Sequence, residues 1–316
     1  MPPHRPFVKS RLSSKTGERH VKNEQIELMK SGEGFIAALD QSGGSTPKAL
    51  ERYGIQSDTY DSDDTMFDLV HAMRVRIMTN SAFARPRVLG AILFEGTMHR
   101  DVEGVGSSLY LWDHKGILPF LKVDKGLADE SDGVQLMKPF EDDLDDRLAE
   151  AQEHGVFGTK MRSVIKGNNQ QGIRSVVEQQ FNLAKQIISN GLVPIVEPEI
   201  DIEAVDKAGC EVHLRQSLRD GLASLDEGTA VVFKLTLPEE AGFYDEFCDN
   251  ERVLRVAALS GGYSQVESNT RLTANHKMIA SFSRALTEHL RVSQSENEFT
   301  SVLDHAIGSI AAASAT

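Results

Sequence analysis

One lysine interrupts an otherwise apolar strand pattern in the run Ala230-Val231-Val232-Phe233-Lys234-Leu235-Thr236-Leu237-Pro238. Removing an ammonium group from water is costly, so a lysine within such a strand tends to lose its proton. The resulting neutral amine is a nucleophile that forms Schiff bases with carbonyl substrates. Taken alone, Lys234 fits equally well at a strand end, where its side chain would reach solvent or form an ion pair. The rest of the chain must decide between the two interpretations.

Seven further apolar runs resemble this one, and segments of helical periodicity separate them. This alternation is typical of α/β proteins. The eight strand-like runs are residues 34–39, 88–94, 118–123, 156–161, 193–196, 230–235, 255–259 and 278–282.

Eight strands with intervening helices predict an α/β fold, a single (β/α)8 TIM barrel, and a doubly wound open sheet is the alternative. We favour the barrel because ionisable residues follow strands along the whole chain, whereas an open sheet concentrates its site at one crossover. The barrel domain is expected over residues 23–316. Residues 1–22 are rich in Pro, Ser, Arg and Lys with one acid, Glu18, and are expected to form a disordered basic tail.

Two helices of the predicted barrel are well marked in the sequence. Residues 175–189 carry a broad apolar face. The last helix begins with a capping box, Ser295-Glu296-Asn297-Glu298, and then carries one apolar stripe. We expect this C-terminal helix to pack against the outside of the barrel.

The composition restricts the class of function. The chain of 316 residues has a formal net charge of −13, whereas nucleic acids and anionic membranes are usually bound by basic surfaces. Cys210 and Cys248 lie in no CxxC motif or Cys/His cluster, so we expect reduced thiols. No apolar run has the length of a membrane span, and the N-terminus lacks the apolar core of a signal peptide. We therefore expect a cytoplasmic protein, with organellar import through residues 1–22 as the alternative.

Polar side chains follow the carboxyl ends of the strand-like runs. Each has an ordinary structural explanation: Asp40 could cap the next helix, and Lys122 with Asp124 could be a solvated charge cluster. Five apolar strands ending in charges of both signs would be an unusual coincidence, because buried charges need partners. In a barrel, such side chains meet at one mouth. In chain order they are Asp40, Lys122 with Asp124, Lys160 with Arg162, Glu197 with Glu199, Lys234, Ser260 and Arg284.

This set of residues fits Schiff-base chemistry. Carbinolamine formation, dehydration and enamine formation at Lys234 need a nearby proton carrier, and Glu197 and Glu199 suit that role. A second cation, Lys160, would favour the neutral amine of Lys234 by like-charge repulsion. Asp40 could then act as base or acid at the hydroxyl of the bond that breaks. A carbanion held as an enamine is the chemistry of an aldol reaction without a metal.

Two loops predict phosphate sites. Ser260-Gly261-Gly262 follows the seventh strand and Ser281-Phe282-Ser283-Arg284 follows the eighth, which is where this fold usually binds phosphate. Glycines there let backbone N–H groups approach an anion, and Arg284 can bind it with two N–H groups. A Gly-Gly pair alone is more often a turn. Ser42-Gly43-Gly44-Ser45, with Lys122, could hold a second phosphate across the mouth, so a bisphosphorylated sugar is the predicted substrate.

Together these residues resemble the class I, Schiff-base fructose-bisphosphate aldolases, and in particular their short bacterial-type branch. The resemblance runs from about Asn23 to the C-terminal helix and implies a (β/α)8 barrel that reversibly cleaves fructose 1,6-bisphosphate to dihydroxyacetone phosphate and glyceraldehyde 3-phosphate, without metal or cofactor. The stretches that carry it are residues 34–48 (Gly34 to Lys48), 121–126 (Leu121 to Gly126), 158–162 (Gly158 to Arg162), 194–199 (Pro194 to Glu199), 234–238 (Lys234 to Pro238) and 259–262 (Leu259 to Gly262).

Carried over residue by residue, the resemblance implies a role for each candidate. Lys234 matches the Schiff-base lysine, Glu197 the acid/base for its formation, and Asp40 the group at the C4 hydroxyl. Lys160 matches the neighbouring lysine, and Glu199 a second carboxylate that orders the site. The C1-phosphate residues are Ser260, Gly261, Gly262 and Arg284; Ser42, Ser45 and Lys122 match the other phosphate site, and Arg162 matches a substrate-contacting arginine.

The chain departs from the longer animal-type enzymes in two places. Those enzymes have glycine where this chain has Ser283, and they end in a mobile tail with a functional tyrosine, whereas this chain ends in Ala311-Ala312-Ala313-Ser314-Ala315-Thr316. Another group or water must therefore do the work of that tyrosine.

Three alternatives stay open. An aldolase for tagatose bisphosphate or a sugar monophosphate would share every residue named. A noncatalytic barrel that binds protein partners would be marked by loss of Lys234 or Glu197, and both are present. A zinc-dependent aldolase is disfavoured because the ten histidines form no HxH or HxxxH pair. A homo-oligomer is compatible with the sequence.

Overall fold

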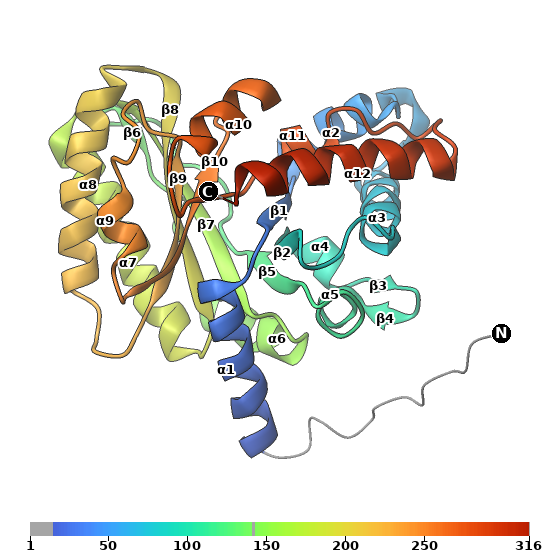
Figure 1. Ribbon diagram of the computed structural model, residues 1–316, viewed down its shortest axis with the longest axis horizontal. Coiled ribbons are helices and arrows are strands. Elements are labelled where there is room, and N and C mark those ends of the chain that lie inside the picture. The colour runs from blue at the N-terminus through green and yellow to red at the C-terminus, as the bar shows by residue number, and fades with distance from the viewer. Residues whose placement is uncertain (1–14, 141–142, 316) are drawn as a thin grey trace.

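Eight parallel strands form the centre of the fold in a computed structural model, which describes residues 15–140 and 143–315 (Figure 1). Each strand pairs with the next, and the N–H of Ala38 donates to the carbonyl oxygen of Phe282 at 3.4 Å, which brings the two ends of the sheet together. The predicted (β/α)8 barrel is confirmed. In order around the sheet, the strands are β1 (Phe35–Leu39), β2 (Val88–Leu93), β5 (Leu118–Lys122), β7 (Gly158–Gly167), β8 (Val193–Val205), β9 (Val231–Thr236), β10 (Val253–Leu259) and β11 (Ile279–Ala280).

Strands β7 and β8 are much longer than predicted, and the eighth strand is shorter. Strands β7 and β8 continue past the barrel as a pair, with Ile165 opposite Ile200, and β6 (Val134–Gln135) adds to β7 in the antiparallel direction. The eighth strand, expected over residues 278–282, is reduced to Ile279–Ala280. A short antiparallel hairpin, β3 (Asp101–Val102) with β4 (Val105–Gly106), lies outside this sheet.

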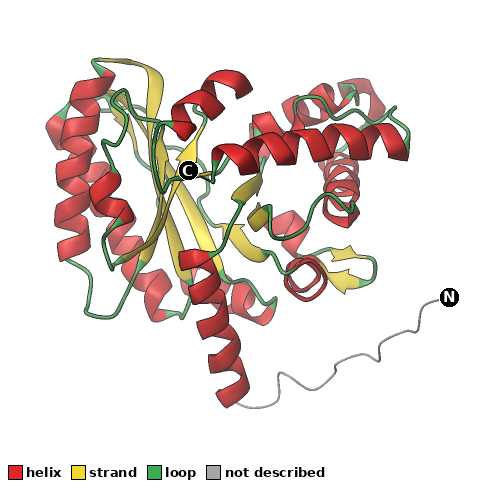
Figure 2. Cartoon of the chain, viewed as in Figure 1, coloured by secondary structure: helices red, strands yellow, loops and turns green. Residues whose placement is uncertain are grey.

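Helices surround the strands, as Figure 2 shows. The capping box at Ser295 is present at the start of the C-terminal helix α12 (Glu296–Ala313), and Phe299 of α12 packs edge-on against Tyr53, on the outside of the barrel as predicted. The other helices are α1 (Lys15–Ser31), α2 (Thr46–Tyr53), α3 (Asp63–Thr79), α4 (Glu95–Met98), α5 (Ser107–Lys115), α6 (Leu144–Glu153), α7 (Gln170–Ser189), α8 (Lys207–Ala223), α9 (Asp245–Cys248), α10 (Gln265–Thr273) and α11 (Arg284–Thr287).

Alternate residues of the strands fill the barrel, because successive side chains of a strand point to opposite faces of a sheet. Ile36 and Ala38 of β1 and Val232 of β9 belong to one buried cluster inside the barrel. The residues between them, such as Phe35 and Phe233, belong to a second cluster, which joins the strands to the outer helices. The same two-residue period places Asp40 and Lys234 on the inner side, at the carboxyl ends of their strands.

Helix α1 packs against the amino-terminal end of the barrel. Arg255 of β10 donates to the carbonyl oxygens of Met29 and Gly32 at 3.1 and 2.9 Å, and Met29 belongs to the interior cluster. Because α1 begins at Lys15, the prediction of a disordered tail over residues 1–22 is wrong for residues 15–22. This helix is mostly polar. It is held by tertiary contacts, which the periodicity of its sequence does not reveal. The remainder of the predicted tail lies outside the described residues.

None of the described helices is both long enough and apolar enough to cross a membrane. Both Cys210 and Cys248 are free thiols, as expected.

Candidate active site

Four of the predicted catalytic side chains meet inside the carboxyl end of the barrel. The Nζ atom of Lys234 lies 2.9 Å from Oε1 of Glu197, and the Nζ atom of Lys160 lies 3.2 Å from Oε2 of the same carboxylate. Lys160 also contacts Oδ2 of Asp40 at 2.7 Å. Lys160 and Glu197 are each 3% exposed and Lys234 is 5% exposed, so these charges lie almost entirely out of bulk water. The strands bring together residues that are far apart in the chain.

Lys160 is held in its charged form. Burial alone would lower the pKa of Lys160, but the carboxylates of Asp40, Glu197 and Asp124 outweigh it and raise that pKa above its usual range. Burial likewise opposes ionisation of Asp40, and Lys160, Lys234 and Lys122 reverse the effect, so the pKa of Asp40 lies well below its usual range. The site therefore contains a fixed ammonium–carboxylate pair beside the Lys234 amine.

Asp124 and Lys122 form a second ion pair behind this group. Oδ1 of Asp124 lies 2.7 Å from the Nζ atom of Lys122, which also donates to the backbone oxygen of Asp124 at 2.8 Å. Oδ2 of Asp124 faces Lys160 at 3.9 Å. Asp124 is buried and extends the acidic surroundings of Lys160. It was seen in the sequence only as part of a charge cluster.

The pair of Glu199 and Arg162 lies next to the Lys234 group. The two residues are on β8 and β7, and the guanidinium of Arg162 donates through Nε to Oε2 of Glu199. Burial raises the pKa of Glu199, although Arg162 opposes the rise. A carboxyl group with a raised pKa can hold a proton closer to neutral pH than an exposed glutamate can.

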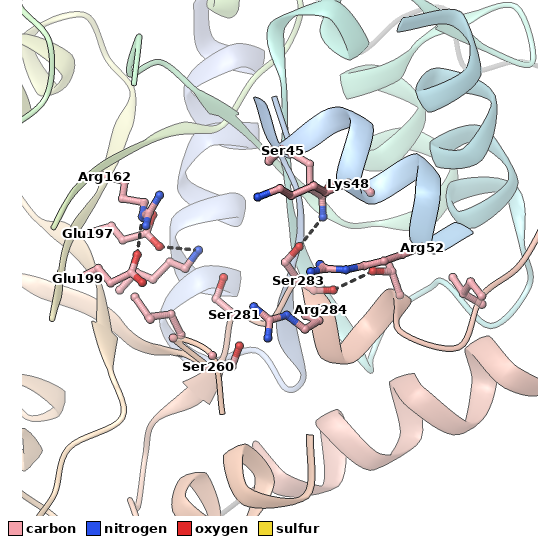
Figure 3. A pocket seen from close by; sticks show the side chains of 18 of the residues that line it. Ser45, Lys48, Arg52, Arg162, Glu197, Glu199, Ser260, Ser281, Ser283 and Arg284 are labelled. Carbon is pink, nitrogen blue, oxygen red and sulfur yellow. Dashed lines mark hydrogen bonds and ion pairs between the residues drawn. The ribbon is translucent and has the colours of Figure 1, made fainter. Parts of the chain in front are cut away.

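A cavity of about 410 Å³ opens onto these residues. Figure 3 shows Arg162, Glu197 and Glu199 on one side of it, facing Lys48 and Arg52 on the other. The lining contains five basic side chains and two acidic ones. The basic residues are Lys48, Arg52, Arg162, Lys234 and Arg284. This excess of positive charge favours an anionic ligand.

The loops after β10 and β11 build one end of the cavity. Gly261 and Gly262 have φ values of 61° and 130°, a region that favours glycine, and a Cβ on Gly261 would lie 2.7 Å from Cγ2 of Ile202. Ser281 is buried and lines the cavity, and its Oγ atom has no hydrogen-bond partner within the part of the chain that the structure describes. A buried hydroxyl without a partner is costly, so a ligand atom would satisfy it. Ser260 and Arg284 also line this end.

Two of the predicted phosphate residues do not line the cavity. Lys122 is turned toward Asp124, and its ion pair with that carboxylate takes the place of the predicted anion contact. Ser42 forms a tight turn in which its N–H donates to Oγ of Ser45 at 2.9 Å, and Ser45 alone of the two reaches the cavity. For these two side chains, contact with a phosphate stays a prediction. Both residues are close in sequence to residues of the site, but local contacts turn their side chains toward Asp124 and Ser45.

Helix α2 supplies two cations that were not predicted as site residues. Lys48 and Arg52 are four residues apart, so they lie on one face of α2, directly after the Ser42–Ser45 turn. This spacing of two basic residues in a helix could have indicated them as site residues. The role of Gln41 was also missed: its Nε2 atom donates to Oγ of Ser283, which joins the loop after β1 to the loop after β11.

Buried Arg74 of α3 supports the loop that carries Asp40. Its guanidinium donates to the backbone oxygen of Gln41 at 2.5 Å and to Oγ1 of Thr97 at 2.7 Å. Burial lowers the pKa of Arg74 to about 10, and the charge of Asp40 opposes that shift. This side chain could not be distinguished in the sequence from an exposed helical arginine.

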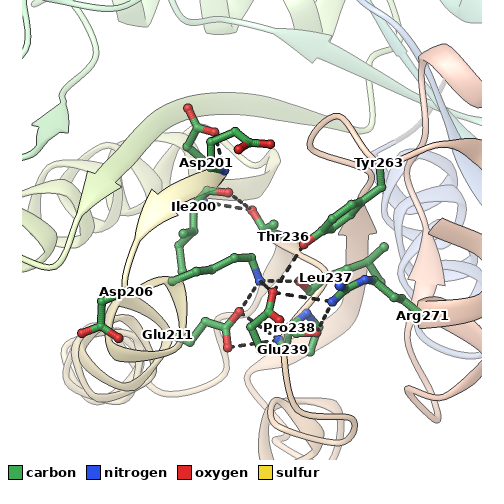
Figure 4. A network of polar contacts seen from close by, with 12 residues as sticks. Ile200, Asp201, Asp206, Glu211, Thr236, Leu237, Pro238, Glu239, Tyr263 and Arg271 are labelled. Carbon is green, nitrogen blue, oxygen red and sulfur yellow. Dashed lines mark hydrogen bonds and ion pairs between the residues drawn. The ribbon is translucent and has the colours of Figure 1, made fainter. Parts of the chain in front are cut away.

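A network of polar contacts ties the glycine loop to strand β9 (Figure 4). The hydroxyl of Tyr263, the residue after Gly262, donates to Oε1 of Glu239 at 3.4 Å, and Lys207 lies 3.0 Å from the same atom. Lys207 is buried, pairs with Glu211 and donates to the backbone oxygen of Leu237 at 2.9 Å. The loop after β10 and the end of the Lys234 strand therefore share one set of supports.

Comparisons with known proteins show the family of this chain. The family model described as fructose-bisphosphate aldolase class-I matches residues 21–209. A curated relative, the fructose-bisphosphate aldolase class 1 of Synechocystis sp. (strain ATCC 27184 / PCC 6803 / Kazusa), is 56% identical over 293 residues, which cover 93% of this chain and 97% of the relative. The second alignment includes the segment around Lys234, which the family match does not reach.

Solved structures show the same fold at low sequence identity. The fructose-bisphosphate aldolase of Plasmodium falciparum, solved in complex with TRAP and an inhibitor, aligns with a TM-score of 0.71, 20% identity and 98% coverage of both chains. A protein of Corynebacterium glutamicum aligns with a TM-score of 0.52 and 11% identity, over 92% of this chain and 94% of the other. From the family model and the 56% identical relative, the chain belongs to the class I fructose-bisphosphate aldolases and is a lyase.

Proposed function

We propose that this chain reversibly cleaves fructose 1,6-bisphosphate to dihydroxyacetone phosphate and glyceraldehyde 3-phosphate through a Schiff base on Lys234, without a metal. The observation that carries the proposal is the buried Lys234 amine, which lines a mainly cationic cavity and lies 2.9 Å from a carboxylate that can exchange protons with it. The membership of a class I aldolase family supports the same substrate.

In the first half of the reaction, the Lys234 amine attacks the C2 carbonyl carbon of the open-chain sugar. Glu197 supplies a proton to the carbonyl oxygen and removes one from nitrogen, so that water leaves and a protonated imine remains. Its Oε1 atom lies 2.9 Å from Nζ, which puts the proton carrier in contact with the atom that changes protonation. Lys160, held charged by three carboxylates, keeps positive potential next to the amine.

In the second half, the bond between C3 and C4 breaks. Asp40 accepts the proton of the C4 hydroxyl, C4 becomes the aldehyde carbon of glyceraldehyde 3-phosphate, and the electron pair passes through C3 into the imine to give an enamine. Protonation at C3 and hydrolysis of the imine then release dihydroxyacetone phosphate and the free lysine. Asp40 is ionised because of its contact with Lys160, so it is ready to accept that proton.

The cationic ends of the cavity are proposed to hold the two phosphates. Ser260, Gly261, Gly262, Ser281 and Arg284 are assigned to the C1 phosphate, because glycine backbone and an unpartnered buried hydroxyl suit an anion. Ser45 is assigned to the C6 phosphate, and Lys48 and Arg52 replace Lys122 in that assignment. Arg162 and Glu199 order the substrate between them.

The proposal is tested by trapping. Full-length protein is incubated with dihydroxyacetone phosphate, reduced with borohydride and mapped by peptide mass spectrometry, beside the Lys234→Met variant and a Lys185→Met control on the exposed face of α7. We expect one adduct, on Lys234, and normal activity in the control. An adduct on another lysine, or activity that survives Lys234→Met, contradicts the proposal.

Two further measurements define the activity. Chelator should leave the rate unchanged; loss of activity that zinc restores, together with no adduct on Lys234, would assign the metal-dependent mechanism instead. Rates on fructose and tagatose bisphosphates, which are epimers at C4, identify the preferred sugar. We also propose a cytoplasmic enzyme whose single catalytic domain begins with α1; light scattering during gel filtration will show whether it forms a homo-oligomer.

A further inference from the structure

A second group of chemically active side chains lies on the outside of the barrel, away from the cavity. His99 directly follows α4, and Glu150 and His154 lie four residues apart at the end of α6. The Nε2 atom of His99 is 2.9 Å from Oε1 of Glu150, and the rings of His99 and His154 have centroids 5.5 Å apart. One ligand atom from each residue lies within 4.8 Å of the other two. None of the three residues has a part in the proposed aldol chemistry.

The donor set suits a borderline transition-metal ion. Two imidazoles and one carboxylate are typical ligands of Zn²⁺ and Co²⁺, with metal–ligand bonds of about 2.0–2.2 Å. Tetrahedral ligands at that distance are about 3.3 Å apart, so spacings of up to 4.8 Å have to close by at most about 1.5 Å. The side chains of His99 and Glu150 are 38% and 44% exposed, so they have room to rotate. We propose that His99, Glu150 and His154 bind one Zn²⁺-type divalent ion, whose remaining coordination positions are filled by water.

Such an ion would join two elements that each contact residues beside the proposed catalytic group. Next to His99, Thr97 accepts a hydrogen bond from Arg74, which holds the backbone of Gln41 beside Asp40. One turn before Glu150, Arg147 donates to the backbone oxygen of Val123, the residue before Asp124, at 3.0 Å. The ion therefore cross-links α4 and α6, stabilises the fold and takes no part in the reaction.

The sequence alone conceals this site because its ligands are not close together in the chain. His99 is 51 residues from Glu150, and the pair on α6 combines a carboxylate with an imidazole, so no pair of neighbouring histidines marks it. The fold brings the three residues together, and Glu95 of α4 also pairs with Arg147 of α6. The Glu150–His154 spacing does place both side chains on one face of α6.

The test uses the full chain after treatment with chelator and removal of the chelator. Zn²⁺ alone is titrated by calorimetry, and Co²⁺ alone is followed by the absorption of its d electrons, which reports nitrogen and oxygen coordination. We expect one ion per chain and a rise in Tm of about 4 °C when Zn²⁺ exceeds Kd about a hundredfold. His99→Ala, His154→Ala and Glu150→Gln should each weaken binding at least about tenfold and abolish the rise in Tm.

His305→Ala is the matched control, because it removes an exposed histidine on α12 that lies outside the group. It should bind and respond as the wild type does. The proposal is overturned by a Kd weaker than about 1 mM, or by equal affinity of the wild type and both histidine variants, which would place the ion elsewhere. The use of three single variants at partly exposed positions protects the conclusion against one that fails to fold. Trapping at Lys234 does not depend on this ion, so each proposal can fail alone.

Discussion

Lys234 and Glu197 face each other from neighbouring strands, with Nζ of the lysine 2.9 Å from Oε1 of the glutamate. The other oxygen of that carboxylate, Oε2, lies 3.2 Å from Nζ of Lys160. One buried glutamate thus contacts both lysines of the site. Its negative charge is shared between the two ammonium groups.

The first prediction concerns this shared carboxylate. Glu197→Gln keeps the shape of the side chain but removes its charge and its ability to carry a proton. We expect kcat to fall by about 10²–10⁴-fold, with slow borohydride trapping, because proton transfer limits imine formation. The free energy of unfolding should fall by about 3 kcal/mol, because two buried ammonium groups lose their common partner. Borohydride trapping stopped at timed intervals measures the rate of imine formation, and urea unfolding measures the free energy of unfolding.

Glu178→Gln is the control for this prediction, since Glu178 forms an exposed pair with Arg174 on α7. An exposed pair of this kind contributes at most about 0.5 kcal/mol. If Glu197→Gln traps substrate at the wild-type rate, Glu197 is not the proton carrier.

A second prediction follows from the Lys160–Asp40 contact. Lys160→Met leaves the buried carboxylates of Asp40, Glu197 and Asp124 without their common cation, so the free energy of unfolding should fall by about 3–5 kcal/mol. Adding Asp40→Asn removes one of the unpaired charges, and the double variant should lose less than the sum of the single variants. Urea unfolding of all four proteins completes the cycle, and Lys277→Met, in an exposed pair with Asp249, is the control. Strict additivity would show that the pair is not coupled.

The same pair predicts a dependence on pH. The pKa of Asp40 is lowered in the folded state, so its ionised form adds stability above its ordinary pKa of 3.8, and that stability is lost as the pH falls further. Lys160→Met removes this contribution and should move acid unfolding to higher pH. An unchanged midpoint in an acid titration followed by circular dichroism would contradict this account.

A third prediction separates the two phosphate sites. If Lys48 holds the C6 phosphate, Lys48→Ala should raise KM for fructose 1,6-bisphosphate by about 10–100-fold and leave KM for fructose 1-phosphate unchanged. Arg284→Ala should raise KM for both sugars, because both carry the C1 phosphate. Lys185→Ala, an exposed lysine on α7, should change neither value. An equal effect of Lys48→Ala on both sugars would reverse the proposed orientation of the substrate.

A fourth prediction concerns Lys22 of α1, whose Nζ atom donates to the backbone oxygen of Phe157 at 2.7 Å. Burial lowers the pKa of Lys22 from 10.5 to about 8. Between these values the unfolded chain holds a proton that the folded chain has lost, so the free energy of unfolding should rise with pH, by up to about 1.4 kcal/mol per pH unit. Below about pH 8, Lys22 should not contribute to the change of the free energy of unfolding with pH.

Urea unfolding of wild type and Lys22→Met from about pH 7 to 10 measures this contribution. Other groups titrate in the same range, so the difference between the two proteins is the quantity of interest. Parallel stability curves would show that Lys22 keeps an ordinary pKa.

The barrel was predictable because its strands are apolar on both faces and appear in the sequence as continuous runs. The parts that were missed depend on tertiary contacts. Helix α1 is too polar to show a clear apolar face, and it is held by Arg255, which lies more than two hundred residues later. The extensions of β7 and β8 support each other beyond the barrel, and neither has the apolar character of a buried strand.

The convergence of the candidate catalytic side chains was predictable because strand ends in a barrel meet at one mouth, so each residue needed only its place after a strand. Lys122 shows the limit of this reasoning, since its position was right but its side chain turns to Asp124. The burial of Arg74 could not be predicted from the sequence either. Its neighbours in the chain are those of a surface residue, yet it donates to the loop beside Asp40.

The contacts among Tyr263, Glu239 and Lys207 relate the position of the glycine loop to that of the strand that carries Lys234. The loop proposed to bind the C1 phosphate contacts Glu239 through Tyr263, and Lys207 contacts both Glu239 and the end of β9, so these contacts support one spacing between that phosphate and the Lys234 amine. A ketose with its carbonyl one carbon farther from the phosphate would bind its anion and present a hydroxyl to the lysine. In the proposed binding mode, the scaffold therefore favours substrates by the distance between their phosphate and their carbonyl carbon.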